Sequence, residues 1–484
     1  MPTADRPTTI AELRASGWRS RSVKDELRSN LLARLAIGGE VLPGIVGYED
    51  TVIPAIENAI LAGHDLVFLG ERGQAKTRMA RLLVGLLDEW LPVVDGGELN
   101  DDPFAPVSPG AKAAVEREGE TTPIDWLHRD RRYAEKLATP DITIADLIGE
   151  VDPIKVAEGR YLSDELTLHY GLIPRANRGI VAINELPDLA ERIQVGLLNV
   201  LEERDVQIRG FTVRLPLDLY VVASANPEDY TSRGRIITPL KDRLGSQIRT
   251  HYPRSLDDEL SIVAQEKHRF ADEVAQLGDG GAPVPPVVVP PFFEELVAEV
   301  THLARRSPEI SQRSGVSVRV SVANMEVLEA AALKRAVRLG EAVGAPRVSD
   351  LGAVIASTVG KVELESVGDE SPEERVVERV ITKALYATFN RRVTLDDLDP
   401  IVEAFEDGFI IETGERTPSR EYVAWLREVP GLDTAVTRLG TFDVTDGAEE
   451  PAVVASAVEF LLEGLHLARR LNKERVPGGT VYHR

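Results

Sequence analysis

A lysine and a threonine end a short glycine-containing loop in this sequence. The loop consists of Gly70, Glu71, Arg72, Gly73, Gln74, Ala75, Lys76 and Thr77. An apolar strand pattern, Leu66–Leu69, precedes it, and apolar residues at helical spacing from Met79 to Trp90 follow it. When such a loop lies between a strand and a helix, its N–H groups and the N-terminus of the helix bind phosphate. The pattern therefore predicts a nucleotide-phosphate site, with Lys76 at the terminal phosphates and Thr77 on Mg²⁺.

One position of this loop departs from the usual phosphate-loop pattern, which has glycine before the lysine. Here that residue is Ala75. If the backbone needs a positive φ angle at this point, alanine costs about 1 kcal/mol. The alternative is an ordinary strand-to-helix turn that contains Lys and Thr by chance. Two further strand ends favour the nucleotide site over that alternative.

The first of these strand ends carries two polar residues that suit phosphate chemistry. The apolar pattern Gly179–Ile183 leads directly into Asn184 and Glu185. A glutamate at this place can polarise the attacking water of a hydrolysis reaction. The Asn184 carbonyl oxygen can accept a hydrogen bond from a Mg²⁺-bound water but adds no negative charge, which predicts weaker Mg²⁺ binding or slower hydrolysis. The alternative role for Glu185 is that of a helix-capping acid.

The other strand end carries an asparagine. The apolar pattern Leu219–Ala225 is followed by Asn226 and a proline. Asn-Pro alone is only a turn signal, but beside the strand of the phosphate loop an asparagine can contact both the γ-phosphate and the water. Between the two strands, the sequence predicts a helix over 189–201 and a β-hairpin over 206–215.

These strands and helices indicate the domain organisation. Strand patterns alternate with helical patterns from Gly44 to about residue 275, which predicts an α/β domain with a mostly parallel sheet. Leucines at helical spacing predict a helix within Ser22–Ile37, and 97–125 is expected to be an irregular insertion. The predicted parts are a helical leader (1–40), the α/β core (41–275), a Pro/Gly linker (276–291), an all-helical lid (292–365) and a mostly helical C-terminal region (366–484). Helical patterns after the linker cover 292–306, 321–339, 348–364, 375–390, 395–407, 417–428 and 451–473.

Composition limits the class of protein. Among 484 residues, acids outnumber bases 79 to 56, the formal charge is −23, and there is no cysteine. The acidity argues against a nucleic-acid binder and against docking on an anionic membrane. The lack of cysteine excludes thiolate metal sites and cysteine nucleophiles, and the eight histidines show no metal-site spacing. The N-terminus lacks a signal-peptide pattern and no apolar stretch approaches the ~20 residues of a membrane helix, so a cytoplasmic location is expected.

Longer segments around these motifs resemble the AAA+ ATPases, in the branch of the magnesium-chelatase I subunit close to the MoxR ATPases. The resemblance covers about residues 40–365. The segments that carry it are Gly44–Glu49, the phosphate loop, Gly149–Asp152, Gly171–Ile180, Asn184-Glu185, Ala225–Glu228 and Pro239–Gly245. Gly171–Ile180 is the most branch-specific, because generic phosphate-loop chemistry does not require it. Residues 366–484 match nothing in the I subunit, which leaves partner docking, oligomerisation and extra helical packing as alternatives.

The resemblance implies further site residues. Asn226 resembles the sensor 1 residue, Arg243 lies in the segment that carries the arginine finger, and Arg319 resembles sensor 2. Val46 and Gly47 lie where the adenine pocket is expected. The alternatives are Arg249 for the finger and Arg313, Arg335 or Arg338 for sensor 2. Each arginine has the further alternative of an ordinary surface ion pair.

The resemblance also implies an activity and partners. The expected protein is an ATP-hydrolysing motor with ATP and Mg²⁺ as cofactors, assembled in a ring that is often a hexamer, because the arginine finger acts on a neighbouring subunit. The expected partner is a von Willebrand A-type (VWA) domain protein or a chelatase D-like subunit. The alternatives are a MoxR-like maturation ATPase with a VWA-domain partner and a nucleotide-gated scaffold with little hydrolysis, which Ala75 and Asn184 favour. A DNA-acting AAA+ protein is disfavoured by the charge, and the Gly-Ala-Phe-Thr-Gly-Ala loop of sigma-54 activators is absent.

Overall fold

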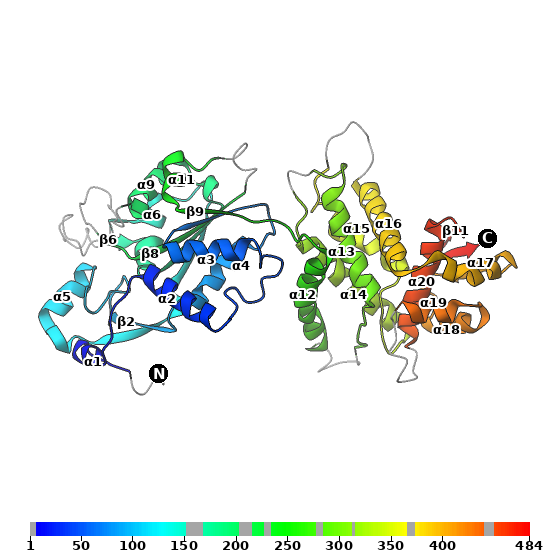
Figure 1. Cartoon of the computed structure of the whole chain (residues 1–484), viewed down its shortest axis with the longest axis horizontal. Helices are drawn as coiled ribbons and strands as arrows, with labels where there is room; N and C mark the ends of the chain where they lie inside the picture. The colour runs from blue at the N-terminus through cyan, green and yellow to red at the C-terminus, as the bar shows by residue number, and fades with distance from the viewer. Residues whose placement is uncertain are drawn as a thin grey trace. The chain divides into compact units, whose positions relative to one another are not determined.

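The chain folds as two compact units, Met1–His251 and Tyr252–Arg484. The structure is a computed structural model that describes residues 6–151, 168–202, 215–226, 234–276, 284–311, 315–364, 373–439 and 450–484. The β-hairpin predicted over 206–215 lies almost wholly outside the described residues. Figure 1 shows the elements of both units.

A five-stranded parallel sheet forms the centre of the first unit. The strands, in their order across the sheet, are β4 (Tyr133–Leu137), β7 (Gly179–Asn184), β8 (Leu219–Ala225), β1 (Leu66–Leu69) and β9 (Ser246–Arg249). Every neighbouring pair is parallel, which confirms the predicted mostly parallel sheet. Strands β7 and β8 are buried along their whole length, as expected for apolar runs at the centre of such a sheet. The carboxyl ends of β1, β7 and β8 lie at one edge, because Leu69 is opposite Ala225 and Ile183 is opposite Ala223.

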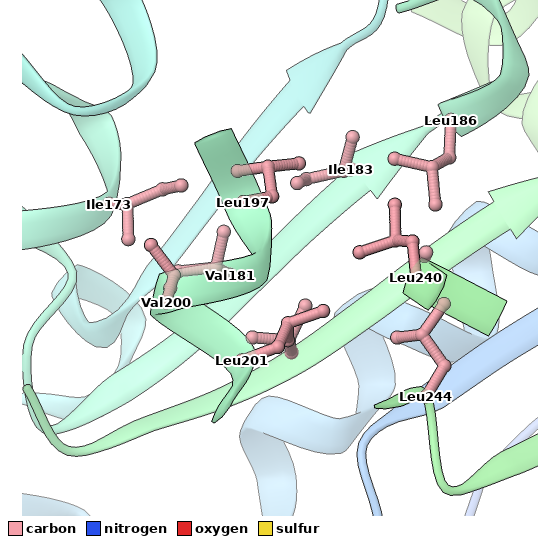
Figure 2. A pocket seen from close by; sticks show the side chains of 11 residues that line it. Ile173, Val181, Ile183, Leu186, Leu197, Val200, Leu201, Leu240 and Leu244 are labelled. Atoms are coloured by element: carbon pink, nitrogen blue, oxygen red, sulfur yellow. The ribbon is translucent and has the colours of Figure 1, made fainter. Parts of the chain in front are cut away.

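Helices cover both faces of this sheet. On one face, α2 (Val23–Ala36), α3 (Val52–Ala62) and α4 (Lys76–Leu82) share a core with β1, β7, β8 and β9. On the other, α8 (Leu172–Arg175), α9 (Glu191–Glu202) and α11 (Thr238–Arg243) pack on β7 and β8. Figure 2 shows this second core, where aliphatic side chains of α9 and α11 lie over Val181 and Ile183 of β7. The remaining helices and strands of the unit are α1 (Ile10–Ala15), β2 (Trp90–Val94), α5 (Pro109–Glu118), β3 (Ile124–His128), α6 (Ile144–Leu147), β5 (Gly149–Val151) and β6 (Leu168–Tyr170).

The leader helix predicted within Ser22–Ile37 is confirmed as α2. It begins where the Ser22 side chain accepts a hydrogen bond from the backbone N–H of Asp25 (3.1 Å), a typical N-cap. On its buried face, Glu26 receives two hydrogen bonds from the Arg132 guanidinium (2.7 and 2.6 Å). This paired interaction ties the leader to the first unit, because breaking a buried ion pair leaves an uncompensated charge.

Two local predictions for this unit are wrong. The helix after the phosphate loop ends at Leu82, continues as a 3₁₀ turn over Leu83–Leu86, and Trp90 begins β2 instead of a helical face. The apolar spacing continues past the helix because β2 buries the same residue types by pairing with β3. The region 97–125 is not irregular throughout, since it contains α5, whose N-cap is Ser108.

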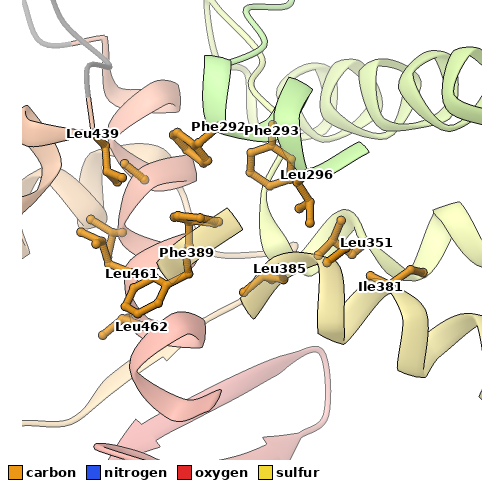
Figure 3. Close-up of a cluster of buried hydrophobic side chains, with 14 of the residues drawn as sticks. Phe292, Phe293, Leu296, Leu351, Ile381, Leu385, Phe389, Leu439, Leu461 and Leu462 are labelled. Atoms are coloured by element: carbon orange, nitrogen blue, oxygen red, sulfur yellow. The ribbon is translucent and has the colours of Figure 1, made fainter. Parts of the chain in front are cut away.

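The second unit is built mainly from helices. They are α12 (Leu256–Gln276), α13 (Pro291–Arg306), α14 (Arg319–Leu339), α15 (Gly352–Thr358), α16 (Glu373–Arg392), α17 (Asp399–Glu406), α18 (Ser419–Glu428), α19 (Leu432–Arg438) and α20 (Pro451–Leu467). One continuous apolar core joins them. Figure 3 shows side chains from α13, α16 and α20 meeting in this core. No helix in the described ranges is both long and apolar enough to cross a membrane.

The structure differs from the expected organisation of the second unit in two respects. The helix α12 groups with the second unit, since Val263 joins its core and Glu259 pairs with Arg305 of α13 (2.6 Å), whereas the core was expected to extend to residue 275. The helix expected over 451–473 ends at Leu467. A small antiparallel sheet, of order β10 (Ile411–Thr413), β12 (Gly479–His483) and β11 (Asn472–Val476), was not expected, because its short strands carry mostly polar residues.

Replacing Tyr482 by phenylalanine is expected to lower the free energy of unfolding by about 1–2 kcal/mol. The buried Tyr482 hydroxyl donates a hydrogen bond to Glu463 of α20 (2.5 Å), which also pairs with Lys473 of β11 (2.6 Å). Removing the hydroxyl deprives a buried carboxylate of one donor. Urea unfolding measures the change, and Tyr386→Phe, the same alteration at an exposed tyrosine of α16, serves as the control. Equal stability of the two variants would contradict this account.

Candidate functional site

The predicted phosphate loop lies between the carboxyl end of β1 and the N-terminus of α4. Lys76 is the first residue of α4 and is only 7% exposed. Its ammonium group donates hydrogen bonds to the carbonyl oxygens of Gly70 and Glu71. The Gly70 N–H in turn donates to Ala225 of the neighbouring strand β8 (3.1 Å). The lysine is therefore held at the loop, at a helix N-terminus that favours anions.

Residues from two other segments brace this loop. The Gln74 side-chain carbonyl oxygen accepts hydrogen bonds from the Thr250 hydroxyl (2.6 Å) and from the Glu71 N–H (3.1 Å). A side chain at Gly70 would collide with Thr250 and Gln74, so this glycine is required by close approach. The Tyr48 hydroxyl lies within hydrogen-bond distance of the Gln74 carbonyl oxygen (3.1 Å), and burial raises the pKa of Tyr48 to about 12. The loop is thus a braced, preorganised structure.

Ala75, which stands where the usual phosphate loop has glycine, has a left-handed backbone conformation. Its φ angle is 56° and its ψ angle 15°, which is the left-handed region. Glu185 is also left-handed, at φ 55°. Among the described residues, five non-glycine residues have positive φ, and two of them lie at this one site. Such strained positions cluster at functional sites.

The variant Ala75→Gly is expected to raise the free energy of unfolding by up to about 1 kcal/mol, because glycine adopts the left-handed conformation without the steric cost of a Cβ atom. The control is Ala80→Gly in the helical interior of α4, which should lower the free energy of unfolding by about 1–2 kcal/mol, because it adds helix-propensity loss to the loss of a buried methyl group. Urea unfolding of both variants checks the prediction. Destabilisation of equal size in both would show that φ at residue 75 carries no strain.

The predicted polar residues at the other strand ends lie at the same sheet edge. Asn184 ends β7, and Asn226 directly follows β8. Ser224 of β8 connects the ends of β7 and β8, since its hydroxyl donates to the Asn184 side-chain oxygen (3.3 Å) and accepts from the Glu185 N–H (3.1 Å). Because Ala225 is also bonded to Gly70, the two strand ends and the phosphate loop form one cluster.

A carboxylate from the edge strand completes this cluster. Glu135 of β4 accepts a hydrogen bond from the Asn184 amide (2.8 Å), two from the Arg81 guanidinium of α4 (2.7 and 3.0 Å) and one from the Tyr133 hydroxyl (3.0 Å). Chiefly the Arg81 hydrogen bond, with help from Tyr133 and Asn184, holds the pKa of the Glu135 carboxyl below its usual value, although burial opposes the shift. Glu135 is therefore a charged acceptor beside Asn184.

The candidate arginine fingers lie on the segment after β8. Arg243 ends α11, and its guanidinium donates to the carbonyl oxygen of Pro239 (2.9 Å). The alternative, Arg249, ends β9 and is exposed. A cavity of about 410 Å³ beside the phosphate loop is lined by Arg249 and Lys241 together with Gly70 and Glu71. Arg249 therefore lies beside the loop of its own chain.

The candidate sensor 2 residues belong to the second unit. Arg319 is exposed and is the first residue of α14. Of its alternatives, Arg313 lies outside the described residues and Arg338 is exposed. Arg335 is buried and bonded to Asp350 and to the Ala345 carbonyl oxygen, so its ion pair assigns it to the core of that unit.

The donor set of the first unit fits a magnesium nucleotide. Mg²⁺ prefers oxygen ligands and retains several waters, and the Thr77 hydroxyl, the Asn184 carbonyl oxygen and the Glu185 carboxylate are oxygen donors on elements that meet at one sheet edge. The segment with Val46 and Gly47 precedes Tyr48, which contacts the loop at Gln74. An adenine pocket at Val46 and Gly47 remains a prediction.

Four residues of the cluster were not predicted from the sequence: Glu135, Arg81, Ser224 and Thr250. Ser224 lies one residue before the end of a recognised strand, and its position there is a signal that could have found it. Glu135 has no such signal, because β4 is short, only partly buried and paired with a strand more than forty residues later.

Comparisons with known proteins show which families this chain resembles. The family model of the Sigma-54 interaction domain matches residues 157–246. The magnesium-chelatase 38 kDa subunit of Cereibacter sphaeroides is 28% identical over 254 residues, which are 49% of this chain and 66% of that protein. The magnesium-chelatase subunit ChlI of Chlorella vulgaris is 26% identical over 252 residues, which are 49% of this chain and 67% of that protein. The chain thus spans about two thirds of the length of these relatives.

A similarity to solved structures is weaker. A reconstruction of the complex between subunits BchI and BchD of magnesium chelatase aligns with a TM-score of 0.34 at 18% identity, covering 70% of this chain and 97% of that one.

The parallel sheet, the phosphate loop and the polar strand ends define a P-loop ATPase core of the AAA+ type, followed by a mostly helical second unit. ATP and Mg²⁺ are the cofactors of such a core. Within this class, the chain resembles the magnesium-chelatase I subunits over about half of its length.

Proposed function

We propose that this protein is an AAA+ motor that hydrolyses Mg·ATP in a ring oligomer and thereby remodels or activates a partner protein, in the manner of a magnesium-chelatase I subunit. The observation that supports it is the convergence of the phosphate loop, Asn184, Glu185 and Asn226 at one edge of the parallel sheet. Phosphoryl transfer depends on positioning and electrostatics, and this edge supplies groups for both.

Each residue at this edge has a part in the proposal. The loop N–H groups and Lys76 bind the phosphates, and the Thr77 hydroxyl binds Mg²⁺. The Asn184 carbonyl oxygen would help to hold the ion by accepting a hydrogen bond from one of its waters. Glu185 orients and polarises the attacking water, and Asn226 contacts the γ-phosphate and that water. Bound Mg²⁺ supplies Lewis acidity at the phosphates.

The site is completed by a neighbouring subunit in this proposal. Arg243 reaches the neighbour's γ-phosphate as an arginine finger, with Arg249 as the alternative, and Arg319 acts as sensor 2. Ring closure, as a hexamer, then makes turnover depend on assembly. The partner is a VWA-domain protein or a chelatase D-like subunit, because the relatives are named as subunits of a chelatase. A MoxR-like maturation task with a VWA-domain partner fits the same site.

A nucleotide-gated scaffold with little hydrolysis is the second candidate. The observation that favours it is Asn184, which contributes no negative charge toward Mg²⁺, and the left-handed Ala75 adds strain to the loop. The two candidates differ in turnover and not in nucleotide binding.

A mixing experiment tests the ring proposal. Arg243→Ala lacks the finger and keeps Glu185, whereas Glu185→Gln keeps the finger. If the finger acts on a neighbour, each variant alone is inactive and an equal mixture recovers activity at about one interface in four, by random assembly. Arg249→Ala, mixed in the same way, distinguishes the alternative finger. Failure of every mixture to recover activity, with assembly of both variants verified, would contradict a finger acting between subunits.

A further inference from the structure

A carboxylate faces the candidate Mg²⁺ residue across the sheet. Glu135 lies on the edge strand β4 and accepts a hydrogen bond from the Asn184 side chain of β7 (2.8 Å). Two elements hold the carboxylate in place, since Arg81 of α4 binds both of its oxygens and Tyr133 of β4 binds one. Glu135 is 20% exposed at its side chain, so it is largely withdrawn from solvent.

This carboxylate decides how the Asn184 amide is turned. An ionised carboxylate only accepts hydrogen bonds, so the amide must present its NH₂ group to Glu135. The carbonyl oxygen of the same amide then faces the opposite way, toward β8, where the Ser224 hydroxyl donates to it (3.3 Å). Strand β8 separates β7 from β1, so the oxygen is presented on the side of the phosphate loop.

The same chain of hydrogen bonds continues to the candidate base. The Ser224 hydroxyl accepts a hydrogen bond from the N–H of Glu185 (3.1 Å). Glu185 has a left-handed backbone, which needs support from its surroundings. One continuous path therefore runs from Arg81 through Glu135, Asn184 and Ser224 to the backbone of Glu185.

We propose that Glu135 is a positioning residue of the Mg·nucleotide site, which fixes the orientation of Asn184 and thereby dictates asparagine in place of aspartate at the end of β7. The proposal rests on the proposed function, because it assigns Asn184 to the Mg²⁺ side of that site. An aspartate at residue 184 would bring two carboxylates to the distance that now separates a donor from an acceptor, and like charges at this distance repel. Of the two side chains, Glu135 on β4 carries a negative charge and Asn184 on β7 carries none.

We expect Glu135→Gln to change the Mg²⁺-dependent tightening of ADP binding in opposite directions, depending on whether residue 184 is asparagine or aspartate. With Asn184 present, Glu135→Gln removes the charged acceptor, and the factor by which Mg²⁺ tightens ADP binding falls by about 5- to 10-fold. With Asn184→Asp already made, Glu135→Gln relieves the repulsion and supplies an amide donor, so the same factor rises by about 5- to 10-fold.

Calorimetric titration of the full chain with ADP, with and without Mg²⁺, measures this factor in the wild type, both single variants and the double variant. Glu150→Gln, the same change at an exposed carboxylate of the first unit, is the matched control and should leave the factor unchanged. Arg81→Gln, at a side chain that is 64% exposed, releases Glu135 without disturbing the core and should lower the factor by about 2- to 5-fold.

The outcomes separate the two proposals. A change of the same sign in both backgrounds, or no change in either, would overturn the positioning role while nucleotide binding stands. Glu135→Gln could instead shift the urea midpoint in opposite directions in the two backgrounds while the Mg²⁺ factor stays unaltered. This result would show that the network only stabilises the fold, and it would also overturn the positioning role. Absence of ADP binding by the wild type would contradict the proposed function itself.

Discussion

Replacing Glu185 by glutamine is expected to lower Mg²⁺-dependent ATP turnover by about 10²- to 10⁴-fold, the usual contribution of a general base. Glutamine has nearly the same shape as glutamate but cannot polarise or deprotonate the attacking water. The Glu185 backbone is held by Ser224, and glutamine keeps that N–H donor. ATP affinity should therefore stay within a few-fold of the wild type. A phosphate-release assay at saturating ATP measures turnover, and calorimetry measures affinity.

Glu191→Gln is the matched control for this experiment, because Glu191 is an exposed glutamate that begins α9, a few residues later in the chain. It should leave turnover unchanged. Undiminished turnover in Glu185→Gln would remove Glu185 from the mechanism. Wild-type turnover no higher than that of Glu185→Gln would favour the nucleotide-gated scaffold.

Replacing Lys76 by alanine is expected to weaken ATP binding by about 10- to 100-fold, since a hydrogen bond to a charged group contributes roughly 1.5–3 kcal/mol. The ammonium is buried at the loop and held by Gly70 and Glu71. It therefore has little conformational freedom to lose when phosphate binds. Calorimetric titration with a non-hydrolysable ATP analogue measures the change.

Lys112→Ala, at an exposed lysine of α5, controls for the general loss of one positive charge and should bind as the wild type does. Equal weakening in both variants would mean that long-range charge and not the loop governs affinity. Unaltered affinity in Lys76→Ala would place the nucleotide elsewhere.

The sequence predicted the parts of the site that follow apolar strands. Strands β1, β7 and β8 are buried runs, and the residue after each is marked by a change from apolar to polar. The loop pattern also singled out Ala75 as a residue that would be strained if its φ angle were positive, and the observed φ angle is 56°. These features are local in sequence, so a single chain is enough to recognise them.

The parts that escaped prediction depend on contacts between distant residues. The hydrogen bond between Glu135 and Asn184 joins residues 49 positions apart. The residues of β4 lack a uniform apolar pattern from which a strand could be predicted. The sheet of β10, β11 and β12 has the same difficulty, since β11 reads Asn-Lys-Glu-Arg-Val and pairs only through tertiary structure. Propensity is weak where packing decides.

Asn184 gains an explanation from these contacts. By sequence it is a departure that removes a negative charge beside Mg²⁺. In the structure a carboxylate is present next to it, on β4, and is fixed by Arg81. A carboxylate that is paired with Arg81 therefore lies one strand away from the position where an aspartate would stand, and it orients the Asn184 amide.

The rate of ATP hydrolysis per chain, followed with and without Mg²⁺ over a range of protein concentrations, tests whether this protein is an ATP-hydrolysing motor that acts as an assembly. Turnover is expected to require Mg²⁺, to rise with protein concentration as subunits assemble, and to fall to background in Glu185→Gln. Turnover that never exceeds that of Glu185→Gln at any concentration would contradict the motor function.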